Sequence, residues 1–181
     1  MMQRFIVILM FSLVIATGSQ AASAPGEYQV KAAYIYNFAK FIHWPDSAFS
    51  DAKAPLVIGV LGTNDFDGEL KPLTGKKIRN RVIEIKYFKT HQKVKNSQLL
   101  YISKSEEKNL QQILKELIPQ PILTVGETQY FVEFGGIIQF VTKRDRLRFS
   151  INLDVAQNNN IQIEAQLLSL AAKVVKGKYS L

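Results

Sequence analysis

Three short and almost wholly apolar runs constrain the fold of this chain more than any other feature of its sequence. They are Leu56–Leu61 (LVIGVL), Leu99–Ile102 (LLYI) and Pro121–Val125 (PILTV). A short apolar run bounded by turn residues is typical of a β-strand. Because segments with helical spacing separate these runs, the sequence predicts strands that alternate with helices.

Apolar residues at three- and four-residue spacing predict the helices. The helices cover Tyr28 to near Trp44, a short segment Asp65–Leu70, the stripe of Leu110, Ile113, Leu114 and Leu117 up to Pro119, and Glu164–Lys176 with Gly177 as its stop. The first helix should end near Trp44, since Pro45 restricts the residue before it. Ser103 to Glu106 matches the S-x-x-E capping box that begins a helix.

Partial alternation of apolar and polar residues predicts a further strand over Ile78–Phe88 and a hairpin of Ile137–Thr142 with Leu147–Asn152. The length of 181 residues suits one domain with its own core. We therefore expect an α/β fold: a single-domain α/β sandwich with a mixed sheet of about five to six strands flanked by helices.

The first residues are typical of an export signal. A positive start at Arg4 precedes the apolar run Phe5–Ile15, which is far shorter than the roughly 20 residues needed to span a bilayer. Small residues at Ser19 and Ala21 predict cleavage after Ala21. The expected organisation is a signal peptide over residues 1–21 and one domain over 22–181, exported to the periplasm.

Composition excludes several classes of enzyme. The chain has no cysteine and two histidines, so a disulfide, a zinc–thiolate site, an iron–sulfur cluster and a cysteine nucleophile are excluded. Hydrophobic residues at 47% and charged residues at 21% are typical of a globular protein. Removal of the leader leaves 22 Lys and Arg against 15 Asp and Glu, a net charge of +7. In an exported protein this charge favours an acidic protein face or an anionic surface over nucleic acid.

No motif in the chain carries a catalytic, metal or cofactor site. Gly59–Gly62 ends a strand but lacks the glycine pattern of a nucleotide-binding turn. Thr63–Glu69 lacks the glutamate that would close a calcium loop. His43 and His91 have no accompanying ligand or triad spacing. A hydrolase would need Asp65, Asp67 and His43 to converge in one cleft.

One tryptophan and two basic clusters are the candidate partner-binding residues. Trp44 lies just beyond the first predicted helix and is a better candidate for an interface or pocket than Phe38 or Phe41, although packing in the core is the favoured alternative. The basic clusters lie beside predicted strands and suit an acidic partner, although a solvated surface is the alternative. The candidate residues are Trp44, Lys77, Arg79, Arg81, Arg144 and Arg146.

Two patterns resemble the YfiR family of periplasmic regulators. The opening helix reads Tyr28-x-x-Lys31-Ala32, then Asn37-Phe38-x-x-Phe41-x-x-Trp44-Pro45, and the closing segment reads Leu147-Arg148-Phe149-Ser150-Ile151-Asn152-Leu153 followed by Ile163-Glu164-Ala165-Gln166-Leu167-Leu168. The similarity covers about Tyr28 to Val175, nearly all of the expected mature chain.

The resemblance implies a non-enzymatic homodimer without a cofactor that binds the periplasmic domain of an inner-membrane signalling protein. That partner would be a YfiN-type diguanylate cyclase, which the regulator represses to control cyclic di-GMP and biofilm formation. Membrane contact would occur only through the partner. Disulfide-based sensing, which occurs in the family, is impossible here because the chain has no cysteine.

A second interpretation belongs to a different class of function. The chain would be a periplasmic small-ligand-binding module that works with a receptor, kinase or transporter. Its support is the Gly59–Gly62 turn at the carboxyl end of a strand, where α/β sheets place ligands.

Overall fold

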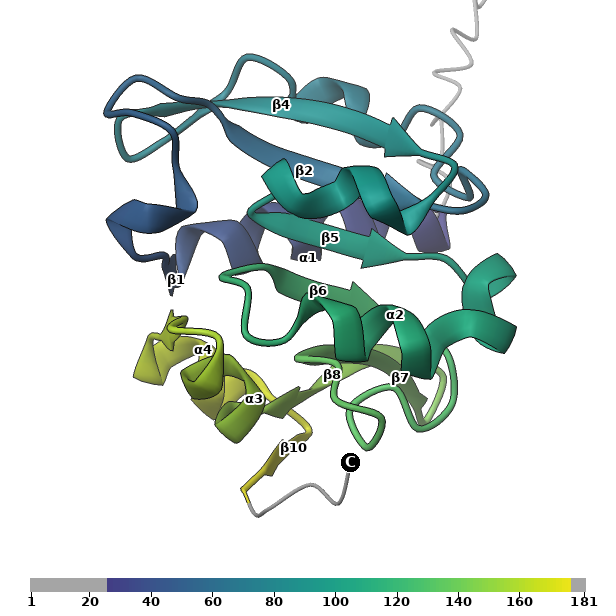
Figure 1. The fold of residues 1–181 in the computed structure, drawn as a ribbon. Helices are drawn as coiled ribbons and strands as arrows, with labels where there is room; N and C mark the ends of the chain where they lie inside the picture. Colours follow the sequence, from purple (N-terminus) through teal and green to yellow (C-terminus); the bar gives the residue numbers. More distant parts are fainter. Residues whose placement is uncertain (1–25, 177–181) are drawn as a thin grey trace, which may run out of the picture.

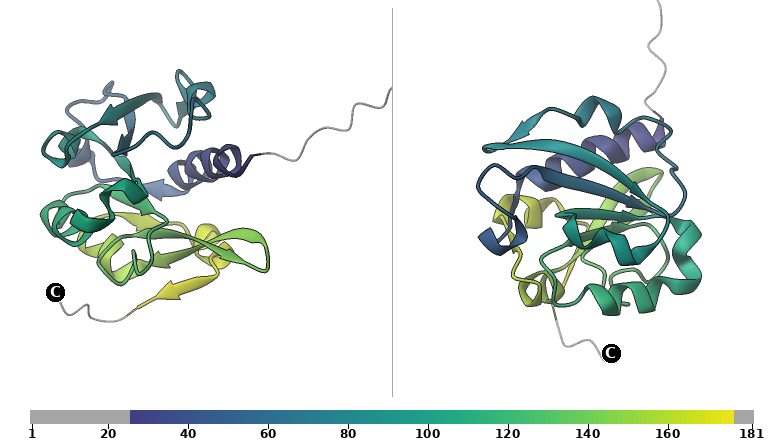
Figure 2. Two further views of the ribbon diagram at one scale, coloured as in Figure 1. Left: turned by 90° about the vertical axis from the view of Figure 1, so that its right-hand side faces the viewer. Right: turned by 45° about the horizontal axis from the view of Figure 1, so that its top comes forward.

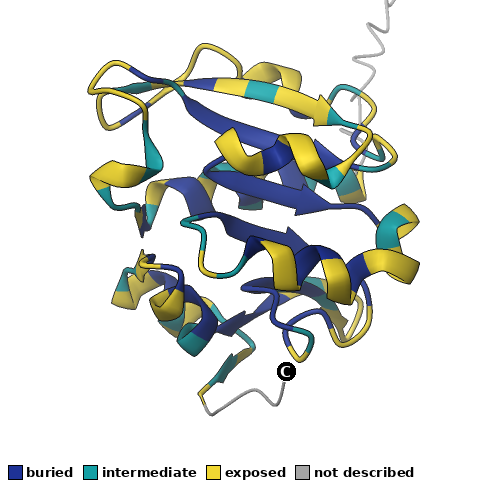
Figure 3. Ribbon diagram, viewed as in Figure 1, coloured by how far each residue is buried: buried dark blue, intermediate teal, exposed yellow. Residues whose placement is uncertain are grey.

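The three apolar runs form neighbouring parallel strands at the centre of an eight-stranded mixed sheet (Figure 1). In the computed structural model, which describes residues 26–176, these strands are β2 (Leu56–Leu61), β5 (Leu99–Ile102) and β6 (Leu123–Gly126). Every residue of the three strands is buried (Figure 3). The expected signal peptide and the expected helix stop at position 177 lie outside the described residues.

Short elements surround these three strands. The other strands are β1 (Ile42–His43), β3 (Lys77–Ile78), β4 (Arg81–Phe88), β7 (Ile138–Lys143), β8 (Arg146–Asn152), β9 (Gln162–Ile163) and β10 (Lys173–Val175). The α-helices are α1 (Glu27–Lys40), α2 (Leu110–Leu117), α3 (Leu153–Asn158) and α4 (Ala165–Leu170). The 3₁₀ helices are η1 (Asp46–Ala48), η2 (Lys71–Leu73), η3 (His91–Asn96) and η4 (Lys104–Asn109).

The sheet has the order β10-β8-β7-β6-β5-β2-β4-β3. Strands β4, β2, β5, β6 and β7 are parallel, whereas β3 and β8 run antiparallel to their neighbours β4 and β7. Strand β4 follows β2 on one side, and β5 then pairs on the other side of β2. The strand order therefore reverses between β2 and β5, the kind of position where α/β folds often bind ligands.

Helices cover both faces of the sheet. Helix α1 lies on one face and α2 on the other (Figures 1 and 2). Alternate residues of the central strands divide between the two layers: Ile58 packs in the cluster that includes α1, and Leu61 packs in the cluster that includes α2. A small antiparallel pair, β1 with β9, lies apart from the main sheet.

An aromatic group joins α1 to the β7–β8 hairpin. The Phe38 ring lies 5.0 Å from the ring of Phe149, 5.7 Å from Phe140 and 5.8 Å from Tyr34, centroid to centroid. Phe38 is fully buried. This group fixes the helix against the antiparallel part of the sheet.

The predicted α/β class is confirmed, but the sheet has eight strands rather than five or six. One extra strand arises because the predicted strand Ile78–Phe88 is two strands. Arg79 adopts a positive φ of 53° and, with Asn80, turns the chain between β3 and β4. A side chain in the left-handed region does not continue a strand.

The other extra strand replaces the second half of the helix predicted over Glu164–Lys176. Helix α4 ends at Leu170, and Ala171 is extended with φ −66° and ψ 141°. The Ala172 N–H then donates to the Phe149 carbonyl at 2.7 Å, and β10 pairs with β8. The apolar spacing of this segment suited a helix, but its β-branched valines also suit the open edge of β8.

Two further helix predictions were wrong in their extent. Helix α1 ends at Lys40 rather than near Trp44, because Ile42–His43 pairs with Gln162–Ile163. Asp65–Leu70 forms turns instead of a short helix, since Asp67 and Gly68 both have positive φ. The predicted hairpin is confirmed, with the two positive-φ residues of a tight turn, Arg144 and Asp145, between its strands.

We predict that Phe38→Ala lowers the free energy of unfolding by about 3–5 kcal/mol, since it removes a fully buried ring from close packing. Urea unfolding followed by far-UV circular dichroism measures the change. Asn37→Ala on the exposed side of the same helix is the control and should change stability by less than about 0.5 kcal/mol. Equal losses in the two variants would contradict the packing described here.

Candidate functional site

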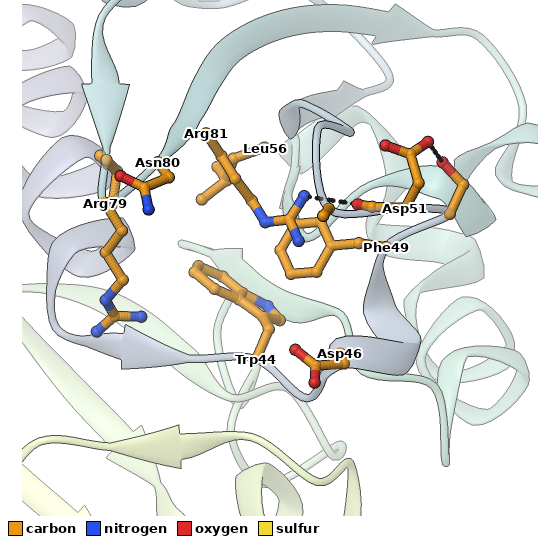
Figure 4. A pocket seen from close by; sticks show the side chains of 11 residues that line it. Trp44, Asp46, Phe49, Asp51, Leu56, Arg79, Asn80 and Arg81 are labelled. Carbon is orange, nitrogen blue, oxygen red and sulfur yellow. Dashed lines mark hydrogen bonds between the residues drawn. The ribbon is translucent and has the colours of Figure 1, made fainter.

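Three of the predicted partner-binding residues, Trp44, Arg79 and Arg81, line one cleft of about 610 Å³ (Figure 4). The loop after β1 supplies Trp44, the turn between β3 and β4 supplies Arg79, and the first residue of β4 is Arg81. Phe49 and Leu56 add apolar surface to the lining. The cleft lies near the amino end of β5, because the Trp44 side chain bonds to the residue that precedes this strand.

Gln98 holds the Trp44 wall of the cleft in place. The Trp44 Nε1–H donates to the Gln98 carbonyl at 2.9 Å. The buried Gln98 side chain accepts from the Val57 N–H at 2.8 Å and donates to the Ala48 carbonyl at 2.6 Å. One side chain thus ties β2 to η1, and its backbone anchors the indole.

Arg81 holds the opposite wall. Its guanidinium stacks over the Phe49 ring, 3.5 Å from the ring centroid. Its Nη1 group donates to the carbonyls of Asp51 at 3.0 Å and Ala54 at 2.6 Å. These contacts pin the 49–54 loop to the start of β4. Neutral carbonyls accept these bonds, and the carboxylates of Asp46 and Asp51 line the same cleft.

Arg79 connects the β3–β4 turn to the small β1–β9 sheet. Its Nη1 donates to the Ile42 carbonyl at 2.7 Å. Its Nη2 lies 3.1 Å from His43 Nε2 and 3.4 Å from Glu164 Oε1, and the histidine and glutamate are 2.9 Å apart. All three side chains are more than a third exposed, so the ion pairs contribute little to stability.

The cleft has the chemistry of a docking surface. Trp44 and Phe49 offer flat apolar area, and the polar part of the lining combines two arginines with Asp46 and Asp51. Within residues 26–176 there is no group of three or more His, Cys, Asp or Glu side chains arranged to hold a metal. The same residues contain no helix long and apolar enough to cross a membrane.

The other predicted partner-binding residues lie outside this cleft. Lys77 is exposed on β3. Arg144 and Arg146 are exposed at the tip of the β7–β8 hairpin, which projects on the same side as α1 (Figure 2, left). The structure brings neither group to Trp44, and their role stays a prediction.

The residues considered for a hydrolase do not converge. Asp65 accepts a hydrogen bond from the Ser103 hydroxyl at 2.7 Å, directly after β5. His43 precedes Trp44, which bonds to Gln98 directly before β5. The two therefore lie at opposite ends of that strand.

Packing requires the glycine at position 59, and backbone conformation favours the glycine at position 62. A Cβ at Gly59 would lie 3.0 Å or less from atoms of Phe88, Ser97 and Leu100, and Gly62 has a φ of +90°. The Ser105 hydroxyl accepts from the Thr63 N–H at 2.9 Å, so the chain itself occupies the carboxyl end of β2.

A buried charge cluster around Glu127 was not anticipated from the sequence. Glu127 follows β6, and its Oε1 accepts from the hydroxyls of Tyr101 at 2.6 Å and Tyr28 at 3.0 Å. Its Oε2 lies 2.8 Å from Lys31 Nζ and 3.2 Å from Lys104 Nζ. The Lys31 side chain is 0% exposed. The opening motif already singled out Tyr28 and Lys31. It did not point to their partner Glu127, which lies 96 residues after Lys31.

The cluster strongly favours ionised Glu127. Burial by itself would raise the pKa of the carboxyl, but the hydrogen bonds from Lys31 and Tyr101, with the charge of Lys31, lower this pKa to about 2. Burial and the neighbouring Glu127 raise the pKa of both Tyr28 and Tyr101 well above that of a free tyrosine. With every oxygen of Glu127 bonded twice, the cluster is a structural link between α1 and the sheet.

Comparisons with known proteins point to one family. A sequence profile described as YfiR/HmsC-like matches residues 28–172. No curated protein matches the chain at a significant level.

Solved structures align with this chain, among them the following two. A conserved domain protein from Vibrio cholerae O1 biovar El Tor aligns with a TM-score of 0.56 and 12% identity over 84% of this chain and 62% of its own. The ABC domain in complex with L-Trp from Streptococcus pneumoniae aligns with a TM-score of 0.48 and 11% identity over 66% of this chain and 55% of its own. This chain therefore spans less than two thirds of either structure. At these identities the similarity to the Vibrio protein shows the fold alone.

We predict that Lys31→Met and Glu127→Gln each lower the free energy of unfolding by about 3–5 kcal/mol, because each leaves its partner buried without full compensation. The double variant should lose clearly less than the sum of the two. Chemical denaturation of the four proteins completes the cycle. Glu27→Gln is the control: Glu27 also pairs with Lys31 but is 63% exposed, so the cost should stay below about 1 kcal/mol. If the loss in the double variant equals the sum of the two single losses, Lys31 and Glu127 are not coupled.

Acid should weaken the protein through Glu127. The folded pKa is depressed below the ordinary 4.5, so the stabilisation is complete above that value and is lost as the pH falls toward about 2. Thermal melts between pH 6 and about 2 should therefore show a smaller drop in melting temperature for Glu127→Gln than for the wild type. Glu107→Gln, at an exposed carboxylate, should retain the wild-type slope.

Proposed function

This chain belongs to the YfiR/HmsC-like family, and we propose that it is a periplasmic regulatory protein that represses an inner-membrane signalling enzyme. The enzyme is a YfiN-type diguanylate cyclase, and the output is control of cyclic di-GMP and of biofilm formation. The observation that carries the proposal is the family match over residues 28–172. The chain acts by binding and performs no catalysis itself.

The expected leader supports the location. Residues 1–21 have the charge, apolar length and small-residue site of a cleaved signal peptide, and residues 22–181 would form one exported domain. The domain acts as a homodimer and meets the membrane only through its partner. Because the chain has no cysteine, the stimulus that releases the partner acts without a thiol.

Repression works as a shift between two states of the cyclase. The regulator binds the inactive state more tightly, and its release removes that bias. We place one contact at the cleft of Trp44, Arg79 and Arg81, where a preformed aromatic surface lies beside two guanidinium groups. Lys77 on β3 and, separately, Arg144 and Arg146 on the hairpin are further candidate contacts outside this cleft.

A second candidate function is a small-ligand module that serves a receptor, kinase or transporter. The cleft volume of about 610 Å³ lies within the range of small-molecule sites. Stabilisation of the purified protein by a metabolite in a thermal-shift screen, together with an unchanged cyclic di-GMP level after gene deletion, would favour this alternative.

We predict that deletion of the gene raises cellular cyclic di-GMP and that the wild-type chain restores the low level. Trp44→Ala should restore it poorly, since truncation of an interface tryptophan typically costs about 2 kcal/mol or more, or at least about thirtyfold in affinity. Asn37→Ala, exposed on α1, is the control and should restore it fully. An unchanged level after deletion would contradict the cyclase proposal, and full repression by Trp44→Ala would remove the cleft from the interface.

A further inference from the structure

Strand β4 leaves half of its outer edge unpaired. It spans Arg81–Phe88 and pairs along its inner edge with β2 over six residues. On its outer edge, β3 pairs only with Arg81 and Val82, and the backbone of Lys76 and Gly75 adds bonds to Ile83. In the part of the chain that the structure describes, no strand pairs with this edge from Glu84 onward. Strand β4 lies at the upper margin of the sheet in Figure 1.

The peptide groups of Ile85 and Tyr87 point out from this edge. In a strand, alternate residues direct both N–H and C=O to the same side. The Phe88 carbonyl accepts from Gly62 on the inner side, whereas both peptide groups of Ile83 bond on the outer side. Ile85 and Tyr87 alternate with Ile83 along the strand, so their N–H and C=O groups also point to the outer side. These groups are available to pair with one more strand.

The side chains along this edge also have the features of an interface. Tyr87 is 47% exposed and Val82 is 39% exposed, two of the four large apolar side chains that remain open to solvent among the described residues. Much of β4 is exposed in Figure 3, in contrast to the buried strands beside it. No proline interrupts the edge to block an added strand.

Positive charge is concentrated around the same edge. Residues 76–95 contain eight Lys and Arg residues and one acidic residue, Glu84, a net charge of +7 in a chain whose total is +8. Seven of the eight cationic residues are exposed, and Arg81 is half-buried. Lys86 and Lys95 also line a hollow of about 490 Å³ on the inner side of β4, and the lining of this hollow contains no carboxylate. Glu84 lies 3.5 Å from Lys86, so it offsets only one of these charges.

We propose that the outer edge of β4, over residues 84–88, binds an extended acidic segment of a partner protein as an added β-strand. Main-chain bonds to Ile85 and Tyr87 supply the register, the exposed Tyr87 ring supplies apolar contact, and the surrounding lysines select acidic side chains. This inference rests on the proposed function and deepens it, because it names a second surface for the partner and the chemistry of the segment that occupies it.

Binding of a model strand tests the proposal without the natural partner. The probe is a capped eight-residue peptide in which glutamate and valine alternate, and the matched control replaces glutamate with lysine. Nuclear magnetic resonance of the ¹⁵N-labelled exported chain follows the amides. We expect saturable shifts centred on Ile85 and Tyr87 with the acidic peptide, slowed exchange of these two amides, and weaker binding at high salt. The lysine peptide should not bind.

Two variants separate the backbone from the charge. Tyr87→Pro removes an N–H that points away from β2, so the inner ladder stays intact, and binding should weaken about fivefold to tenfold. Tyr87→Thr keeps the N–H and is its control. Charge reversal at Lys86 and Lys89 to glutamate should weaken binding of the acidic peptide by about tenfold or more without touching the backbone, and it serves as the test if Tyr87→Pro melts at a lower temperature.

Several results would overturn the proposal. These are equal binding of the two peptides, shifts confined to the Trp44 cleft, and unchanged binding by the folded Tyr87→Pro and charge-reversal variants. Self-association that the acidic peptide does not displace and that Tyr87→Pro abolishes would assign the edge to a second copy instead. The two proposals can be tested separately. If deletion raises cyclic di-GMP but the peptide does not bind, the regulatory function is kept and this surface is rejected. If the peptide binds but deletion leaves cyclic di-GMP unchanged, the surface is kept and the cyclase proposal is rejected.

Discussion

Strands β2, β5 and β6 have no residue open to solvent, so their side chains must be covered on both faces and their backbones must bond to neighbouring strands. Helix α1 covers one face and α2 the other, and each draws on alternate residues of the same strands. The central strands are therefore covered on both faces, whereas β4 at the margin is largely exposed. A partner or ligand can therefore bind at the two ends of the strands or at the outer edge of β4.

Each of these places uses polar groups differently. At the amino end, Gln98 and Arg81 satisfy loop carbonyls and hold an open cleft around Trp44. At the carboxyl end, the fully buried Lys31 pairs with the largely buried Glu127, and this ion pair links α1 to the sheet. The edge of β4 differs from that cluster, since the backbone groups of Ile85 and Tyr87 are unpaired and Glu84 offsets only one of the surrounding positive charges.

The sequence predicted the central strands, the antiparallel hairpin and the first helix because short apolar runs and helical spacing report burial directly. It predicted Trp44, Arg79 and Arg81 individually as candidates, and the structure places them in one cleft. It missed Glu127, because the pairing with Lys31 joins segments 96 residues apart and no local pattern marks either residue as buried. It also assigned Val174 and Val175 to a helix, since their spacing suits a helix when the open edge of β8 is not known.

By itself the sequence determined the α/β class, the absence of any thiol chemistry and the family, because these depend on composition and on patterns within single segments. Only the tertiary structure decided which polar groups meet and which are left open. Tertiary packing brings Lys31 and Glu127 into an ion pair, whereas β3 is too short to pair with Ile85 and Tyr87. Both outcomes depend on contacts between distant segments, and such contacts follow from the order of the strands rather than from any local property of the chain.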